Sequence, residues 1–283
     1  MAHPALAPGH VAVITGGASG IGLAAALRLA QRGLMICIAD LGADRLARAA
    51  EMIAAAAPSG ADSVMTSETD VSSYDAMQTL AATVSARFGG VDVLMNNAGI
   101  QIDTSSFGPR AHWERLLAVN LGGVLNGVQA FTPGMIARGR PGLVINTGSK
   151  QGITTPPGNP AYNVAKAGVK ALTEALQHEL RNTPGCQITA HLLIPGFVFT
   201  PLTRGDRTVK PAAAWTPEQT VDFMLQSVDA GDFYILCPDN DVPRALDEKR
   251  MAWAIGDLIE NRPPLSRWHP DYADAFKAFV AKT

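Results

Sequence analysis

The sequence predicts an α/β fold built on a doubly wound parallel sheet of seven strands, with helices on both faces. Apolar runs of strand length alternate along the chain with longer segments of helical periodicity. Residues 11–14 and 35–38 are apolar at every position, as expected of parallel strands that are buried on both faces. Right-handed crossovers between parallel strands then place helices on both faces of the sheet.

The alternation assigns each element in order. The expected strands are residues 10–15, 34–40, 63–68, 91–96, 143–147, 187–194 and 233–237. The expected helices are residues 21–32, 44–57, 73–88, 112–137, 161–181 and 217–230. Because no internal repeat or linker interrupts them, residues 1–283 are predicted to form one domain with its core at 10–237. Residues 200–216, rich in proline, are predicted to be a loop or lid.

Residues 238–283 are predicted to form a helical C-terminal extension, because their apolar residues follow helical spacing on both sides of a proline pair. Helices of this length need packing partners to be stable in water. Two arrangements provide them. The extension is either a buttress against the chain's own sheet, or it places Trp253, Trp268 and Tyr272 over the substrate pocket of the same or a neighbouring subunit.

Composition and charge disfavour several classes of protein. With 47% apolar residues, a net charge of -2 and no cluster of Lys or Arg, the chain has no electrostatic footprint for nucleic acid or an anionic membrane. It has no signal-like N-terminus and no long apolar run, so we expect a soluble, cytoplasmic protein. Cys37, Cys186 and Cys237 are expected to be buried free thiols. The six histidines show no ligand spacing, so no catalytic metal is predicted.

A glycine-rich turn follows the first strand and runs directly into a helix. Such a turn lets the backbone approach a pyrophosphate, whose charge is met by free N–H groups at the helix N-terminus. The alternative is an ordinary glycine-rich turn. The candidate cofactor-binding residues in it are Gly16, Ser19, Gly20, Ile21 and Gly22.

Asp40 ends the second strand and lies 24 residues after Gly16. A carboxylate there can accept hydrogen bonds from the adenosine ribose of NAD and repels the 2′-phosphate of NADP. Arg45, on the following helix, is the only nearby cation. The predicted cofactor is therefore NAD, and the alternative is that Asp40 is a solvated residue at a strand end.

Tyr162 and Lys166 are four residues apart in a predicted helix, which places the phenol and the ammonium group on one face. A phenol with a pKa near 10 is a poor base at neutral pH, but a fixed cation beside it stabilises the phenolate. Tyr-x-x-x-Lys pairs also arise by chance on helix surfaces, so the surrounding motifs decide the interpretation.

Those motifs resemble the classical short-chain dehydrogenases/reductases over residues 10–237, and thus imply a Rossmann-type fold. The motifs are the glycine turn, Asp70, Asn96-Asn97-Ala98-Gly99, Asn120, Ser149, Tyr162 with Lys166, and Pro195-Gly196. The resemblance implies an NAD(H)-dependent oxidoreductase that interconverts a secondary alcohol and a ketone. Residues 120–127 and 135–142 are also similar to the branch of lignin-dimer Cα-dehydrogenases, which points to a hydrophobic or aromatic substrate.

The resemblance also implies a role for each residue. Tyr162 is the expected general acid/base, Ser149 holds the substrate oxygen, and Lys166 lowers the tyrosine pKa and binds the nicotinamide ribose. Asn120 anchors a water that relays protons. Asp70 and Val71 contact the adenine, and Asn97, Ala98 and Gly99 pass alongside the cofactor. Pro195, Gly196, Val198 and Thr200 seat the carboxamide.

Bland alternatives remain open for individual residues. Asn120 can serve to cap or kink its helix, and Ser149 can be a plain strand-end hydroxyl. Lys150 is either a cation at the pocket rim or a solvated side chain. The expected substrate wall consists of Ile153, Thr154, Thr155, Pro156, Phe197, Phe199, Leu202 and Trp215.

Two alternative functions remain open, that of an epimerase or dehydratase and that of a dinucleotide sensor. An epimerase or dehydratase would use the same tyrosine and lysine, and a non-catalytic dinucleotide sensor would be expected to lack one of them. We expect a homotetramer, or else a homodimer, formed by the helices that follow Pro109 and Asn159. The small residues expected to permit close helix approach there are Gly122, Gly123, Gly127, Ala165, Gly168 and Ala171.

Overall fold

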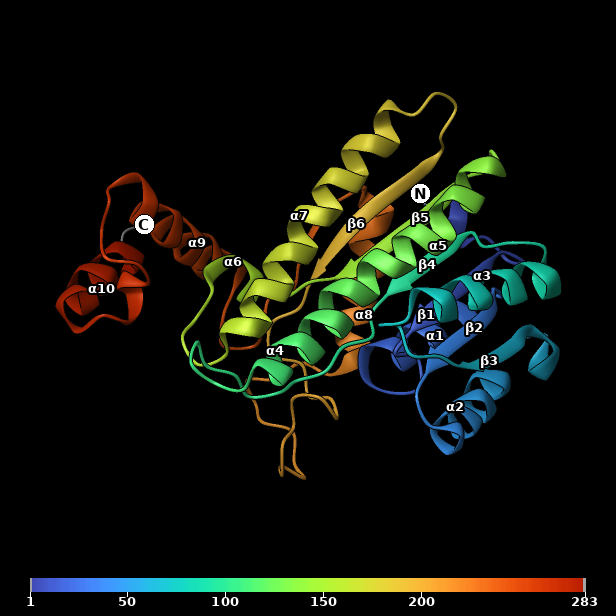
Figure 1. The fold of residues 1–283 in the computed structure, drawn as a ribbon, viewed down its shortest axis with the longest axis horizontal. Coiled ribbons are helices and arrows are strands. Elements are labelled where there is room, and N and C mark those ends of the chain that lie inside the picture. The colour runs from blue at the N-terminus through green and yellow to red at the C-terminus, as the bar shows by residue number, and fades with distance from the viewer. Residues whose placement is uncertain (1, 282–283) are drawn as a thin grey trace.

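The chain folds around one parallel sheet of seven strands in the computed structural model, which describes residues 2–281 (Figure 1). The strand order is β3-β2-β1-β4-β5-β6-β7, and every neighbouring pair is parallel. The strands are β1 Val11–Thr15, β2 Met35–Asp40, β3 Val64–Glu68, β4 Val93–Asn96, β5 Gly142–Thr147, β6 Ile188–Ile194 and β7 Tyr234–Leu236. The predicted fold class and all seven strands are confirmed.

Two helical layers cover the sheet, each with its own apolar core. One core joins helices α1, α2 and α8 to residues such as Ile14 and Ile38, and the other joins α3, α5 and α7 to Val13 and Leu94. Alternate residues of one strand thus face opposite layers. The helices are α1 Gly20–Gln31, α2 Ala43–Ala56, α3 Tyr74–Phe88, α4 Arg110–Leu117, α5 Gly123–Ala137, α6 Gln151–Thr154, α7 Pro160–Asn182, α8 Pro217–Ala230, α9 Arg244–Ile259 and α10 Ala273–Ala281.

The order of the strands reverses between β1 and β4, which are neighbours although two strands separate them in sequence. Ligands of open α/β sheets bind outside the carboxyl ends of the strands at such a switch point. The glycine turn follows β1 and the Asn97 segment follows β4, so both lie at this edge.

The single helix expected at residues 112–137 is interrupted. Helix α4 passes through a π-helical turn, Ala118–Gly122, into α5. The turn contains Asn120, the residue for which the sequence offered a role in capping or kinking its helix. π-Turns occur often at functional sites. Apolar periodicity alone did not reveal it, because the turn shifts the register by one residue without ending the pattern.

The small residues on α5 and α7 pack within the chain. A side chain at Gly123 would meet Val71 at 2.6 Å, and one at Gly168 would meet Leu121 at 2.9 Å. A side chain at Gly127 would collide with Asn96. Contacts inside the chain are therefore sufficient to require glycine at these three positions, and the predicted contact between subunits stays a prediction.

The C-terminal extension projects beyond α6 and is drawn in red at the left of Figure 1. Helix α9 contacts α6, and α10 packs on α9. Trp253 is buried inside the extension, where its indole N–H donates to Ser266 Oγ at 2.8 Å and its ring meets those of Phe276 and Phe279. Trp253 therefore does not line the cavity that contains Tyr162, although Trp253 and Trp268 border a hollow shared with Ile153. Met251 of α9 packs against the cluster that contains Leu236 of β7, so the extension contacts the sheet at that point.

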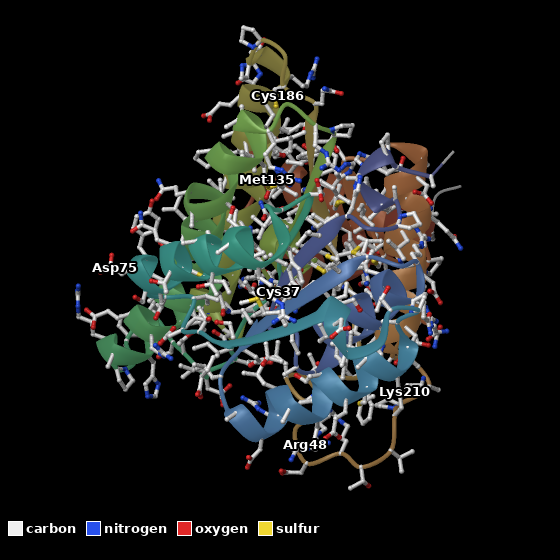
Figure 2. All side chains as sticks on the ribbon, turned by 90° about the vertical axis from the view of Figure 1, so that its right-hand side faces the viewer. Cys37, Arg48, Asp75, Met135, Cys186 and Lys210 are labelled. Atoms are coloured by element: carbon white, nitrogen blue, oxygen red, sulfur yellow. The ribbon has the colours of Figure 1, made fainter. Side chains whose placement is uncertain are left out.

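Two of the three cysteines are buried. Figure 2 shows Cys37 among the side chains of the sheet and Cys186 near one end of the molecule. Burial raises the pKa of Cys37 and of Cys237 to about 12, which makes these thiols inert. Cys186 is partly exposed. None of the helices within residues 2–281 has the length and apolarity needed to cross a membrane.

Candidate active site

The glycine turn after β1 packs closely against two other backbone segments, the first turn of α1 and the turn at Ala98 that follows β4. Gly16 and Gly20 have φ of +65° and +53°, values that favour glycine. A side chain at Gly16 would lie 2.8 Å from Ala98 Cα, and one at Gly22 would collide with the Gly16 carbonyl. Ser19 is the N-cap of α1, but its side chain does not cap the helix. The N–H groups of the first turn are thus available to an anion.

Asp40 points into this turn. Its Oδ2 accepts a hydrogen bond from Ala18 N at 3.0 Å, and its Oδ1 accepts one from Leu41 N at 2.8 Å. The side chain is 16% exposed, so it is not the solvated strand-end residue of the alternative interpretation. Arg45 Nη2 lies 3.7 Å from Oδ1, which places a cation closer to the site than its position on the following helix suggested.

Thr15, which the motifs did not single out, joins β1 to the segment after β4. Its Oγ1 accepts hydrogen bonds from Asn97 N at 3.0 Å and Ala98 N at 3.1 Å. The Asn97 side chain donates in turn to the carbonyls of Thr15 and Gly16, at 3.2 and 3.3 Å. These contacts fix the Asn97-Ala98-Gly99 turn against the glycine turn. A buried hydroxyl at the end of a strand was the available signal.

Asp70 and Val71 occupy the other side of the switch point. Hydrogen bonds from Ser72 lower the pKa of Asp70, and Arg115 lies 3.3 Å away. The Val71 carbonyl accepts a hydrogen bond from Asn126 Nδ2 at 2.8 Å. Arg115 of α4 thus holds Asp70 in place, and Asn126 of α5 holds Val71.

Asn120 is fully buried and bonds to one backbone unit. Its Oδ1 accepts from Ile100 N at 2.8 Å, and its Nδ2 donates to the Ile100 carbonyl at 2.9 Å. This pair attaches the π-helical turn to the segment that follows Gly99. Asn120 is therefore a structural link between two walls of the site, whatever further role it has.

Tyr162, Ser149 and Lys166 lie together. Helix α7 carries the tyrosine and the lysine, and Asn159 caps the helix by accepting from Tyr162 N at 3.3 Å. Ser149 follows β5 and lies near enough to the phenol to lower its pKa. Lys166 Nζ donates to the Thr147 carbonyl at 2.8 Å and lies 5.7 Å from the centre of the tyrosine ring.

The pKa values of this group differ from the sequence expectation. Burial raises the pKa of Tyr162, and the hydrogen bond with Ser149 acts in the opposite direction. Burial also lowers the pKa of Lys166 to about 8. The net shift of the tyrosine pKa is upward, because desolvation outweighs the opposing effect of Ser149.

The buried lysine should make the free energy of unfolding depend on pH. The folded protein releases the Lys166 proton near pH 8, whereas the unfolded chain keeps it until about pH 10.4. The unfolded state binds more protons between these values, so stability should rise with pH across this window, by at most about 3 kcal/mol. Lys166→Met should lack this rise, and Lys170→Met, on the same helix, should retain it. Urea unfolding from pH 7.5 to 10.5 measures it, and parallel curves for wild type and Lys166→Met would contradict the assignment.

The segment after β6 closes the site. Val198 forms an isolated β-bridge with Trp215, and Phe199 N donates to the Trp215 carbonyl at 2.9 Å. These bonds hold the base of the loop at residues 200–216, which contains no helix or strand; Figure 2 labels Lys210 on it. Trp215 itself packs against Phe223 of α8, with ring centres 5.8 Å apart.

Lys150 is neither a rim cation nor solvated, so both sequence interpretations of it are wrong. Its Nζ lies 3.0 Å from Asp239 Oδ1 and 2.6 Å from Asp247 Oδ2, and its side chain is 18% exposed. Asp239 Oδ2 also accepts from Phe197 N at 2.9 Å. The residue after Ser149 is thereby tied to the segment after Gly196 and to helix α9.

A single cavity of about 380 Å³, here called the main cavity, gathers these residues. It falls within the usual size range of small-molecule sites. Every predicted site residue lines it except Gly22, which packs behind the glycine turn. The sequence missed other lining residues, among them Leu41, Arg45, Ile100, Arg115, Thr147, Pro201 and Thr203.

The expected substrate wall is only partly assembled. Leu202 lines the main cavity, whereas Ile153, Thr154 and Thr155 line a different hollow beside the C-terminal extension. Trp215 belongs to the core. Within residues 2–281, no group of three or more His, Cys, Asp or Glu side chains is placed to hold a metal ion.

Comparisons with known proteins agree with this geometry. The model of the short chain dehydrogenase family matches residues 10–210. SadH of Mycobacterium tuberculosis is 40% identical over 176 residues, and the chain spans 61% of the length of SadH. D-beta-hydroxybutyrate dehydrogenase of Rhizobium meliloti is 35% identical over 192 residues, covering 68% of this chain and 72% of that protein. A short chain dehydrogenase/reductase from Burkholderia phymatum, solved in complex with NAD, has a TM-score of 0.80 at 28% identity, with 91% of this chain and 96% of the other covered.

The sheet topology and the tyrosine-lysine pair at its carboxyl edge define a dehydrogenase or reductase of the Rossmann type. The chain belongs to the short-chain dehydrogenase/reductase family. The predicted family is thereby confirmed.

Proposed function

We propose that the protein is an NAD(H)-dependent oxidoreductase that interconverts a secondary alcohol and a ketone, with Tyr162 as its general acid/base. The observation that carries the proposal is that Tyr162, Ser149 and Lys166 line the same cavity as the glycine turn and Asp40. A proton-transfer group and a dinucleotide-binding turn are thus within reach of one small molecule.

The residues of the main cavity fit a dinucleotide. The uncapped N-terminus of α1 suits the pyrophosphate, because Gly16 and Gly22 keep the backbone open to close approach. Asp40 would accept from the adenosine ribose, with Asp70 and Val71 at the adenine. The remaining contacts would come from Asn97, Ala98 and Gly99 along the cofactor, and from Pro195, Gly196, Val198 and Thr200 at the carboxamide. Bound NAD would supply the acceptor or donor of hydride.

The protein's own residues manage the proton. Ser149 lines the same cavity as Tyr162, so it is placed to orient a substrate oxygen beside the Tyr162 hydroxyl. Tyr162 takes the proton of an alcohol or gives one to a ketone. The buried ammonium group of Lys166 faces the same cavity, where it would hold the ribose and favour the phenolate. Asn120 would anchor a water that carries the proton onward.

The substrate proposed is hydrophobic or aromatic. Ile100, Val119 and Leu202 line the main cavity together with Ser149 and Tyr162, and the ammonium group of Lys166 beside them is bonded to the backbone. An uncharged body next to the reacting carbon suits such walls. The sequence similarity to the Cα-dehydrogenase branch points the same way.

A panel of secondary alcohols and ketones, followed by the absorbance of NADH, tests the function. We expect turnover with an aryl or long-chain member of the panel and none with Tyr162→Phe. Tight NADH binding without turnover of any member would favour a dinucleotide sensor. Conversion of a sugar nucleotide without net change in NADH would favour an epimerase or dehydratase.

We further propose that the protein is a homotetramer, or failing that a homodimer, in solution. Val164 of α7 and Leu125 of α5 are 49% and 38% exposed, although both lie on helices that are otherwise packed. Burial of these residues against a second copy would remove apolar surface from water. Sedimentation at micromolar concentration should show the oligomer, and Val164→Glu should weaken it. A wild-type monomer would contradict the proposal.

A further inference from the structure

Two adjoining hollows lie between α6 and the C-terminal extension. The smaller one, the inner hollow, has a volume of about 60 Å³ and is lined by Lys150, Ile153, Thr154, Leu236, Asp247, Arg250, Met251 and Arg267. The outer hollow, of about 860 Å³, shares five of these residues. Neither hollow shares a lining residue with the main cavity.

The charges around the inner hollow are not balanced. Lys150 forms ion pairs with Asp247 at 2.6 Å and with Asp239 at 3.0 Å. Within residues 2–281 a third carboxylate, that of Asp257, lines the outer hollow, but Arg262 pairs with it at 2.9 Å. Arg250 and Arg267 line the same hollow. Three cations therefore face two carboxylates, and one positive charge is left over.

The two arginines carry the excess. Within residues 2–281 neither guanidinium has a carboxylate within ion-pair distance, and the buried Nε of Arg250 has no hydrogen-bond partner. Arg267 lies over the rings of Trp268 and Phe276, at 4.7 and 5.2 Å. Burial, and next the charge of Arg250, lower the pKa of Arg267. Like charges held together and partly desolvated are costly unless an anion compensates them.

We propose that this place binds an organic carboxylate. The carboxylate group enters the inner hollow between Arg250 and Arg267, and an apolar body lies in the outer hollow against Ile153, Met251 and Trp268. Guanidinium groups match the planar, two-oxygen geometry of a carboxylate. The inner hollow has room for about two water molecules, at roughly 30 Å³ each, which suits a carboxylate rather than a larger anion. The size and apolar wall of the outer hollow distinguish an organic anion from an inorganic one.

Calorimetric titration of the full chain with octanoate and benzoate tests the proposal. Octan-1-ol and benzyl alcohol are the matched neutral ligands, and inorganic phosphate is the matched anion without an apolar body. We expect a carboxylate to bind at least about tenfold more tightly than its alcohol and than phosphate. Arg250→Gln and Arg267→Gln should each weaken that binding about 10- to 100-fold, as loss of a charged hydrogen bond does. Arg244→Gln, an exposed arginine on the same helix paired with Glu248, should leave it unchanged.

Four results would overturn the proposal. One is the absence of carboxylate binding at millimolar concentration, and another is binding that both arginine variants retain. The third is phosphate binding as tight as carboxylate binding, which would make this an inorganic anion site. Displacement by NADH would place the ligand in the main cavity instead. Because Tyr162→Phe should bind octanoate like the wild type, the result is independent of the proposed reaction.

Discussion

Replacing Tyr162 by phenylalanine is expected to lower kcat by a factor of about 10² to 10⁴, which is the usual contribution of a general acid/base. The ring is partly buried among Leu116, Ala161 and Ala165, so phenylalanine should fill the same space and lose only the hydroxyl. NADH affinity should remain within a few fold of the wild-type value, because the turn at Gly16 and Asp40 is untouched. Steady-state rates on the best substrate, together with NADH fluorescence titration, measure both quantities.

Tyr74→Phe is the matched control for this variant. Tyr74 is 39% exposed at the start of α3 and lies outside the main cavity, so its change should leave kcat unaltered. If Tyr162→Phe kept more than about a tenth of the wild-type kcat, another group would have to move the proton. A parallel loss of NADH binding would instead indicate a disturbed fold.

Replacing Asp40 by alanine is expected to raise the ratio of catalytic efficiencies, NADP(H) over NAD(H), by roughly 10²- to 10³-fold. The carboxylate is mostly buried and would face a 2′-phosphate, and such like-charge contacts cost several kcal/mol. Removal of the carboxylate also frees Arg45, now 3.7 Å from Asp40, to meet the phosphate. Measurement of kcat/KM with both cofactors checks the ratio.

A double variant separates the loss of repulsion by Asp40 from the new contact that Arg45 can make with the phosphate. Asp40→Ala combined with Arg45→Gln should keep the gain that comes from lost repulsion and forfeit the part that comes from Arg45. Equal efficiencies of the wild-type protein with both cofactors would contradict the NAD preference. So would an unchanged ratio in Asp40→Ala.

The sequence was sufficient to predict the sheet and most of the cavity. Uninterrupted apolar runs such as residues 35–38 identify buried parallel strands, and motif residues that follow strands must gather at one edge. That is why Asp40, Asn97 and Ser149, which are far apart in sequence, were predicted to lie together. Local spacing and strand order together determine these positions.

The rest depended on contacts that no local pattern encodes. Thr15 orders the Asn97 turn through its hydroxyl, yet threonine at a strand end has no distinctive spacing. Lys150 is defined by two carboxylates that follow about 90 residues later. Trp253 is held by Ser266 and Phe276, so its direction could not be inferred from the helical face it occupies.

The Lys150 cluster also bears on how the molecule opens. Detachment of α9 would separate the buried carboxylate of Asp247 from Lys150, whose neighbour in the chain is Ser149. Asp239, which lies before α9, would keep its contacts with Lys150 and with Phe197 N. An uncompensated buried charge is costly, so partial opening of this region is disfavoured. The extension, the segment that follows Ser149 and the segment that follows Gly196 should therefore exchange their amide hydrogens as one cooperative unit, with similar free energies of opening. The C-terminal extension, which projects from the rest of the ribbon, is therefore expected to open and close together with the residues beside Ser149, as part of the same foldon.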